Sequence, residues 1–248
     1  MRDTFSITNA LTIDVEDYFQ VSAFAPHIER SDWDSRECRV ERNVDRILAL
    51  LEAADTKATF FTLGWIAERY PVLVRRIVEG GHELASHGYG HERVSDLSEV
   101  AFFNDIHSAK ALLEDIGGVR VQGYRAPSFS IGAGNLWALD TLQRAGYRYS
   151  SSIYPIKHDH YGMPDAPRFS HQIRDGLIEV PPTTLRMLNR NLPSSGGGYF
   201  RLFPYALSRW MLRMCWSLMI DGTSSMRGPP SKITMRERKS SFSSSLSL

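Results

Sequence analysis

The stretch HELASHGYGH (residues 82–91) decides the fold and points to a site. Its first half is strand-like, and its second half places His87 and His91 four residues apart, with two glycines and a tyrosine between them. Two imidazoles at this spacing can reach one metal ion, either from one face of a helix or from a tightly turned loop that contains glycine. Two unrelated surface histidines would give the same spacing, so the rest of the chain has to decide.

The bulk composition indicates a soluble globular protein. Of the 248 residues, 42% are hydrophobic and 23% charged, and the net charge of +1 favours neither a nucleic-acid partner nor an anionic membrane. The two cysteines, Cys38 and Cys215, are too few for a disulfide framework. Because the N-terminus turns acidic where a signal peptide would be apolar, and no run approaches a membrane span, we expect a cytoplasmic protein.

Strand-like and helix-like segments alternate along most of the chain. We expect strands in 9–15, at the start of 57–70, in 82–87, 121–129 and 148–155. We expect helices in 40–56, at the end of 57–70, and in 71–81, 97–118, 132–147 and 202–216. The alternation predicts an α/β fold with a parallel sheet, either doubly wound or closed as a barrel.

The last part of the chain has a different character. Residues 156–200 are rich in loop-forming residues, and the segment after Trp216 is rich in Ser and Arg/Lys. Because such a composition does not build a core, we expect a catalytic domain over 1–216 and a disordered tail over 217–248.

Chemically active side chains follow the ends of three predicted strands. Asp14, Glu16 and Asp17 follow the first strand, His87 and His91 follow HELAS, and Arg125 follows VQGY. In parallel α/β folds, sites gather at the carboxyl ends of the strands. Two imidazoles, one carboxylate ligand and a second carboxylate as base would suffice for metal-assisted hydrolysis.

Three ordered motifs then resemble a known family. LTIDVEDYF (11–19), HELASHGYGH (82–91) and YRAPSF (124–129) look like the first motifs of the polysaccharide deacetylases, the NodB-homology domain of carbohydrate esterase family 4. DVEDYFQVSAF (14–24), YPIKHDHYG (154–162) and NLPSSGGGYFRLFPY (191–205) resemble the subgroup associated with exopolysaccharide and exosortase gene clusters.

The resemblance implies a distorted (β/α) barrel of the NodB-homology type and a divalent metal, often zinc. The implied reaction removes N-acetyl groups from N-acetylhexosamine units of a bacterial exopolysaccharide. His87 and His91 would be metal ligands, and Asp14 would be the general base. Glu16 is the favoured acidic ligand because residues i and i+2 of a strand share a face, with Asp17 as the runner-up.

Further roles follow from the same resemblance. Arg125 would pair with the base carboxylate and keep it ionised. Pro127 would shape the wall of the substrate groove, and Phe129 and Tyr199 would contact sugar rings.

The chain departs from the family pattern in its last part. The family has a late histidine that protonates the leaving amine, whereas no histidine follows His171 in this sequence. We therefore expect a barrel that lacks its last strand and helix, and weak or absent turnover. Two alternatives remain open: an amidohydrolase of a cyclic imide or ureide on the same barrel, and a remnant that binds metal and sugar without turnover. The sequence does not give the oligomeric state.

Overall fold

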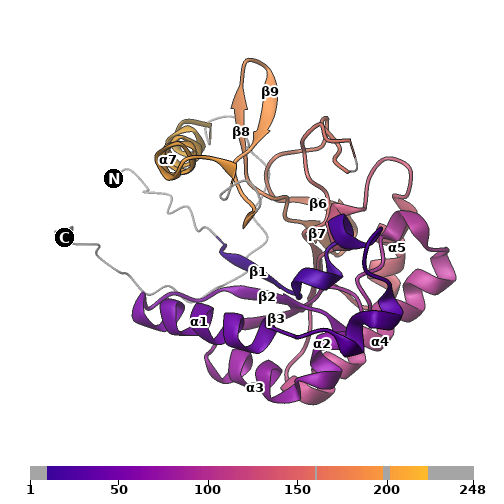
Figure 1. Cartoon of the computed structure of the whole chain (residues 1–248). Helices are drawn as coiled ribbons and strands as arrows, with labels where there is room; N and C mark the ends of the chain where they lie inside the picture. Colours follow the sequence, from indigo (N-terminus) through magenta and orange to yellow (C-terminus); the bar gives the residue numbers. More distant parts are fainter. Residues whose placement is uncertain (1–9, 160, 198–201, 223–248) are drawn as a thin grey trace.

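The computed structural model describes residues 10–159, 161–197 and 202–222. Its centre is a seven-stranded sheet in the order β1-β2-β3-β4-β5-β7-β6 (Figure 1). Neighbouring strands pair in parallel except for β6 and β7, which form an antiparallel hairpin. The strands are β1 (Thr12–Val15), β2 (Thr59–Thr62), β3 (Glu83–Ser86), β4 (Gly123–Tyr124), β5 (Tyr149–Ser150), β6 (His171–Arg174) and β7 (Leu177–Glu179).

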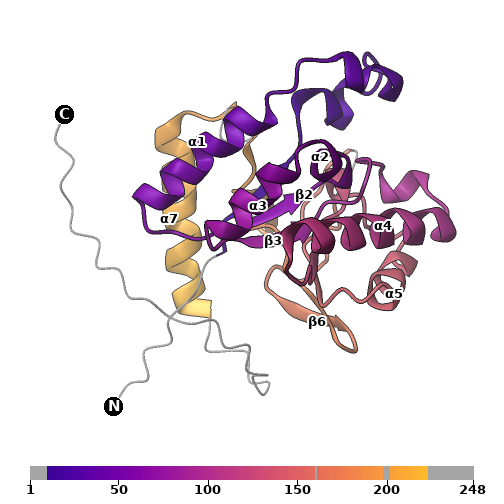
Figure 2. The same cartoon turned by 90° about the horizontal axis from the view of Figure 1, so that it is seen from below.

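Helices connect the parallel strands and cover one face of the sheet. They lie in front of the strands when the molecule is seen from below (Figure 2). Since β1 to β5 follow one another in the sheet in sequence order, right-handed crossovers place every connecting helix on the same face, as in a (β/α) barrel. This confirms the α/β fold with barrel-type winding, although the pairing of the described strands does not close from β6 to β1. The helices are α1 (Val40–Ala53), α2 (Gly64–Arg69), α3 (Pro71–Glu79), α4 (Glu99–Gly117) and α5 (Trp137–Arg144).

Helix α4 begins and ends where the sequence predicts. The hydroxyl of Ser98 accepts the backbone N–H of Ala101, so one free donor of the first turn is satisfied. Gly118 ends the helix with φ of 64°, a left-handed conformation that glycine adopts at little cost.

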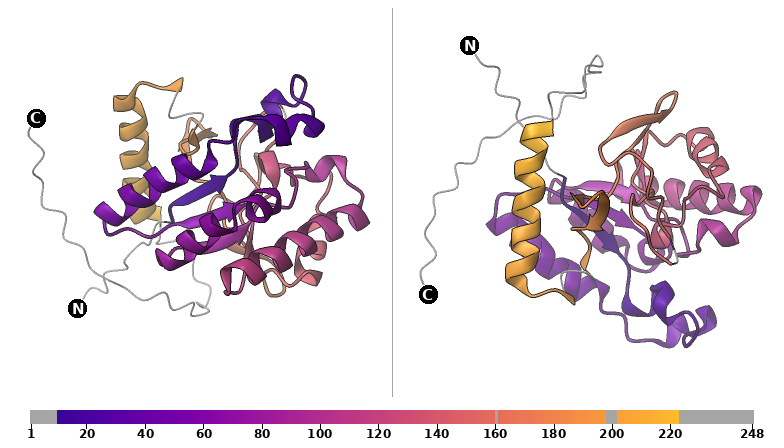
Figure 3. Two further views of the ribbon diagram at one scale, coloured as in Figure 1. Left: turned by 60° about the horizontal axis from the view of Figure 1, so that its bottom comes forward. Right: turned by 90° about the horizontal axis from the view of Figure 1, so that it is seen from above.

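The C-terminal part differs from its prediction in two ways. The described residues between 156 and 197 contain four strands, where the sequence indicates mostly loop. They are β6 and β7 together with the hairpin of β8 (Thr184–Met187) and β9 (Arg190–Pro193). Helix α7 (Tyr205–Gly222) confirms the last predicted helix, but it continues past Trp216 into the segment predicted to be disordered. Residues 223–248 lie outside the described part. Helix α7 packs beside β8 on the side of the sheet away from α1–α5 (Figure 3).

Successive side chains along β1 point to opposite faces of the sheet, and this separates core residues from site residues. Val15 is 1% exposed and packs in the hydrophobic cluster that includes Val44 of α1 and Ile77 of α3. Asp14 and Glu16 flank Val15 and therefore face the opposite side of the sheet. Within the described ranges, no helix combines the length and the apolar character that a membrane span requires.

Candidate metal centre

Three donor side chains that follow β1 and β3, the strands on either side of β2, meet at the carboxyl edge of the sheet. Glu16 follows β1, and His87 and His91 belong to the loop after β3, here called the histidine loop (residues 87–91). One ligand atom from each of the three side chains lies within 4.8 Å of those of the other two. Oε2 of Glu16 is 2.7 Å from Nε2 of His91 and 3.8 Å from Nε2 of His87.

The donor set fits a divalent cation. Ligands about 2.1 Å from a tetrahedral ion lie about 3.4 Å apart, and the two measured separations lie on either side of that value. Oε2 of Glu16 is buried and makes no hydrogen bond with the described residues, which is costly for a carboxylate without a cation. Both imidazole side chains are only 3% exposed.

The ring of His87 is oriented by a neighbouring strand. Its Nδ1 lies 2.8 Å from the carbonyl oxygen of Arg125, and since a carbonyl only accepts, Nδ1 carries the proton. Nε2 is then left with a lone pair toward Glu16, the arrangement typical of a metal-binding histidine. Burial lowers the pKa of His87, with the charges of Asp14 and Glu16 acting in the opposite direction, so the neutral ligand form is favoured.

The backbone of the histidine loop is held from both sides. The first two N–H groups of α2, from Gly64 and Trp65, donate to the carbonyls of Gly88 and Tyr89, each at 2.9 Å. The carboxylate of Asp105 in α4 accepts the N–H of Tyr89 at 3.0 and 3.1 Å and that of Gly90 at 3.3 Å. The loop is therefore fixed before any ligand binds.

Asp105 also explains the glycine at position 88. Gly88 has φ of 78°, and a Cβ there would lie 2.7 Å from Oδ2 of Asp105. Burial raises the pKa of Asp105, and the N–H groups that it accepts only partly oppose this effect. The sequence analysis did not identify Asp105, although an acid directly before the buried Ile106 of α4 was a visible signal.

Asp14 forms a separate ion pair beside the three donors. Its Oδ1 lies 2.7 Å from Nη1 of Arg125, and the side chains of Asp14 and Arg125 are 28% and 8% exposed. Burial alone would raise the pKa of Asp14, but the charge of Arg125 and its hydrogen bond to the carboxylate oppose this effect, and the pKa is lowered. The carboxylate is therefore held ionised next to the candidate metal site.

Arg125 is fixed by the segment that follows β5, here called the serine turn (residues 151–153). Its Nε donates to the carbonyl of Ser151 at 3.2 Å, and its Nη2 donates to the Ser151 hydroxyl at 2.9 Å. The N–H groups of Ser152 and Ile153 donate in turn to Oε1 of the buried Glu179 in β7, at 2.8 and 2.9 Å. Neither Ser151 nor Glu179 was expected from the sequence.

Asp17 does not join the cluster, and this corrects its prediction as the alternative ligand. It lies two positions after Val15 and thus on the α1 side of the strand. Its carboxylate accepts the N–H of Val40 at 2.8 Å and also that of Arg39, so it caps the start of α1. The geometry leaves Glu16 as the acidic donor.

The three residues predicted to contact substrate have different outcomes. Pro127 is buried in the short turn after Arg125, with its Cγ beside Gly88, so it forms part of the wall next to the histidine loop. Phe129 is partly exposed, and its ring lies 5.6 Å from the Arg125 guanidinium. Tyr199 lies outside the described residues.

Two family models match consecutive parts of the chain. A family model described as polysaccharide deacetylase matches residues 32–150, which include the histidine loop and Arg125. Over this segment the chain is similar to the polysaccharide deacetylase family. A second model, described as a domain of unknown function (DUF3473), matches residues 151–220.

Individual relatives of the deacetylase domain match parts of the chain. A peptidoglycan-N-acetylglucosamine deacetylase of Bacillus cereus is 33% identical over 113 residues, or 41% of this chain and 41% of that protein. A chitooligosaccharide deacetylase of Azorhizobium caulinodans is 28% identical over 149 residues, or 59% of this chain and 67% of that protein. The chain thus spans about two fifths of the length of the Bacillus relative.

One solved structure shares the fold over most of the chain. The crystal structure of a putative polysaccharide deacetylase from Mycobacterium smegmatis superposes with a TM-score of 0.59 at 25% identity. The alignment covers 86% of this chain and 72% of that one, so it extends beyond the deacetylase domain into the part that the second family model describes.

Proposed function

We propose that this chain is a metal-dependent hydrolase that removes N-acetyl groups from N-acetylhexosamine units of a polysaccharide. The observation that carries the proposal is the juxtaposition of two sets of side chains. Glu16, His87 and His91 offer three ligand atoms within 4.8 Å of one another, and the Asp14–Arg125 ion pair lies next to them. The match of residues 32–150 to the polysaccharide deacetylase family model supports the same conclusion.

The donor set suits zinc, because two imidazoles and one carboxylate are the ligands of many catalytic zinc sites and leave a position open. A divalent ion bound there would supply a Lewis acid for the amide carbonyl and would acidify a water molecule. Glu16 would hold the ion together with His87 and His91.

Asp14 would act as the general base. Arg125 engages its Oδ1, which leaves Oδ2 as the atom that takes a proton from the attacking water. Since Arg125 keeps the carboxylate ionised, the base is ready at neutral pH. The water oxygen adds to the amide carbon, the carbon–nitrogen bond breaks, and acetate and a free amine leave.

The amine needs a proton in order to leave, and the chain offers no histidine after His171 for this task. A general acid contributes about 10²–10⁴-fold to the rate. We therefore propose that turnover by this chain is impaired, with metal and sugar binding retained. Pro127 and Phe129, with Tyr199, would border the groove, and a bacterial exopolysaccharide is the proposed polymer.

The test is acetate release from N-acetylglucosamine hexamers by the zinc-loaded chain, alongside ring opening of a cyclic ureide as the competing reaction. We expect slow acetate release, no ring opening, and no acetate from His91→Ala. Ring opening without acetate would overturn the proposal. Bound zinc and bound oligomer without any acetate would show a binding remnant instead.

A further inference from the structure

The guanidinium of Arg125 makes contacts of two kinds. It donates hydrogen bonds to Asp14 and, twice, to Ser151. These bonds lie in the plane of the guanidinium, because all of its donors do. Two aromatic rings supply the other contacts, since Cζ of Arg125 lies 4.1 Å from the ring centre of Phe61 and 5.6 Å from that of Phe129. Both distances are within the range of about 6 Å over which a ring face attracts a cation.

The two rings are held in different ways. Phe61 lies in β2 and is 1% exposed, so the sheet fixes its position. Phe129 is partly exposed and ends the short turn η5 (Pro127–Phe129), which begins two residues after Arg125. Its ring packs edge to face against that of Tyr154, with the ring centres 5.2 Å apart. The contact of Phe129 with the guanidinium therefore depends on the conformation of this turn.

The turn has an unfavourable backbone conformation. Ser128 and Phe129 have φ of 54° and 50°, in the left-handed region that a residue with a Cβ adopts only at a cost in free energy. Residues of this kind persist where the surrounding structure holds them, and they are found preferentially at functional sites. Contacts from outside the turn are therefore needed to keep the Phe129 ring where it is.

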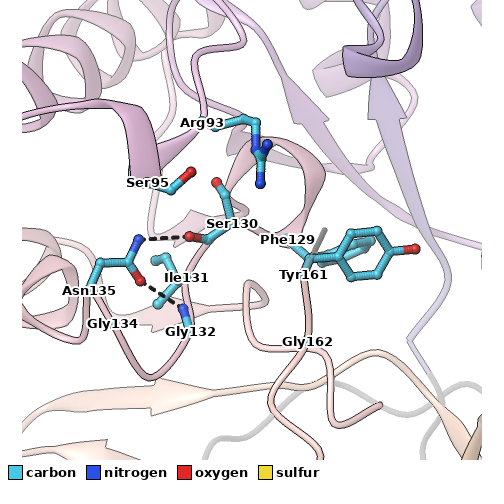
Figure 4. Close-up of a pocket in the computed structure, with 10 residues that line it drawn as sticks. All are labelled: Arg93, Ser95, Phe129, Ser130, Ile131, Gly132, Gly134, Asn135, Tyr161 and Gly162. Atoms are coloured by element: carbon cyan, nitrogen blue, oxygen red, sulfur yellow. Dashed lines mark hydrogen bonds between the residues drawn. The ribbon is translucent and has the colours of Figure 1, made fainter. Parts of the chain in front are cut away.

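Hydrogen bonds of the backbone and of Asn135 hold the turn locally. The N–H of Phe129 donates to the carbonyl of Ala126 at 3.0 Å. The next residue, Ser130, accepts the side-chain N–H of Asn135 at its carbonyl, at 2.8 Å (Figure 4). The Ser130 hydroxyl donates back to the carbonyl of Pro127 at 2.7 Å. Both ends of the turn are thus fixed.

The middle of the turn is joined to a distant part of the chain. The hydroxyls of Ser22 and Ser128 share a hydrogen bond, with their Oγ atoms 2.5 Å apart. Ser22 begins η2 (Ser22–Phe24), six residues after Glu16. The segment that follows β1 is therefore connected directly to the turn that follows Arg125, in addition to the ion pair between Asp14 and Arg125.

We propose that Phe129 is a positioning residue for catalysis. Its ring holds the Arg125 guanidinium beside Asp14, and the hydrogen bond between Ser22 and Ser128 holds the turn that presents the ring. The effect on catalysis rests on the proposed function, since Asp14 is a general base only if the chain is a hydrolase. The effect on the order of the Arg125 side chain does not rest on it.

The first measurement needs no turnover. In the zinc-loaded chain, NMR follows the exchange of the Arg125 Nε–H with water, and its resonance is the one missing from Arg125→Lys. Phe129→Leu keeps an apolar side chain without a ring, and exchange should become about tenfold faster because the bond to Ser151 opens more often. Phe103→Leu is the matched control: Phe103 lies 5.9 Å from the exposed Arg144, and its loss should leave exchange at Arg125 unchanged.

Two variants of Ser22 test the hydrogen bond to the turn. Ser22→Ala removes the hydroxyl, so exchange at Arg125 should be about threefold faster, a smaller effect than loss of the ring. Ser22→Thr keeps a hydroxyl at the same position and should restore the native rate. Thermal unfolding confirms that each variant is folded.

Acetate release separates positioning of Arg125 from contact with substrate. If Phe129 positions Arg125, kcat on N-acetylglucosamine hexamers should fall about tenfold in Phe129→Leu while KM stays within about twofold. Contact with sugar rings, the role that the sequence predicts for Phe129, would instead raise KM and leave kcat unchanged. Zinc affinity should stay native in Phe129→Leu, because Phe129 offers no ligand atom.

The outcomes separate this inference from the proposed function. Native exchange at Arg125 in a folded Phe129→Leu chain, or a rise in KM alone, would overturn the inference and leave the deacetylase function standing. Native exchange in Ser22→Ala would overturn the part assigned to Ser22. Faster exchange in Phe129→Leu, with no acetate from any of the chains, would support the hold of Phe129 on Arg125 and contradict the proposed function.

Discussion

Two carboxylates hold the backbone behind the candidate site, and they do so differently: Asp105 is partly buried, and Glu179 is fully buried. Asp105 uses both oxygens on the backbone of the histidine loop. Glu179 accepts two backbone N–H groups of the serine turn behind Arg125, both at Oε1. The loop that carries two candidate metal ligands is therefore held at more points than the turn that holds the arginine.

The difference matches the geometric demands on the two parts of the candidate site, the histidine loop and the Asp14–Arg125 ion pair. Three ligand atoms must keep their mutual separation to within a few tenths of an ångström for a metal ion, whereas Arg125 is held by its own two hydrogen bonds to Ser151. Metal binding by Glu16, His87 and His91 should thus depend strongly on Asp105, whereas the Asp14–Arg125 pair should depend only weakly on Glu179. Burial raises the pKa of both carboxyls.

Asp14→Asn is the change with the largest expected effect. Acetate release should fall about 10²–10⁴-fold because the base is lost, while zinc affinity stays within about threefold. Calorimetry and an acetate assay on the same preparation measure the two quantities, with Asp45→Asn, an exposed acid of α1, as the control. A large loss of zinc affinity would show that Asp14 is needed for metal binding as well as for catalysis.

Asp105→Ala tests whether metal binding needs the carboxylate that holds the histidine loop. Zinc affinity should fall about 10–100-fold because the histidine loop loses the acceptor for two N–H groups. Asp115→Ala, at an exposed position of the same helix, should leave zinc affinity unchanged, and Glu179→Gln should change it less than threefold. A loss of zinc affinity in Glu179→Gln as large as that in Asp105→Ala would contradict the expected difference between the two carboxylates.

Asp17→Ala should affect stability and not the metal. The variant removes the acceptor for the N–H groups of Arg39 and Val40 at the start of α1, so the free energy of unfolding should fall by about 1 kcal/mol. Urea unfolding measures this change. Loss of zinc binding in a folded Asp17→Ala chain would instead indicate that Asp17 is a metal ligand.

Glu179→Gln has the smallest expected effect, visible as a change in pH dependence. Because the pKa of Glu179 is raised in the folded chain, its contribution to stability is present below the unfolded pKa, near 4.3, and is lost as pH rises through the folded pKa. The stability of the native chain relative to Glu179→Gln should therefore decline above about pH 4.3. Urea unfolding at stepped pH values measures the decline, and a difference independent of pH would contradict it.

The candidate-site side chains that follow strand ends can be predicted from the sequence. Asp14, Glu16, His87, His91 and Arg125 could be predicted because periodicity places their strands and because their residue types signal chemistry. Asp105, Ser151 and Glu179 could not, since they act on backbone N–H groups or on the arginine, and backbone partners leave no pattern in side-chain identity.

The same limit applies to the fold. The parallel strands and their helices have strong periodic signals, and they form close to where the sequence predicts them. The hairpins β6–β7 and β8–β9 are built from three- and four-residue strands in a proline-rich segment, where tertiary pairing and not local propensity decides the conformation.

Zinc titration of three chains tests the central claim that Glu16, His87 and His91 hold one cation. We predict one zinc ion per native chain, an equal ion count and affinity in Asp17→Asn, and an affinity more than about 100-fold lower in Glu16→Gln, which is a greater loss than removal of a supporting residue causes. Unchanged zinc affinity in folded Glu16→Gln would contradict the account.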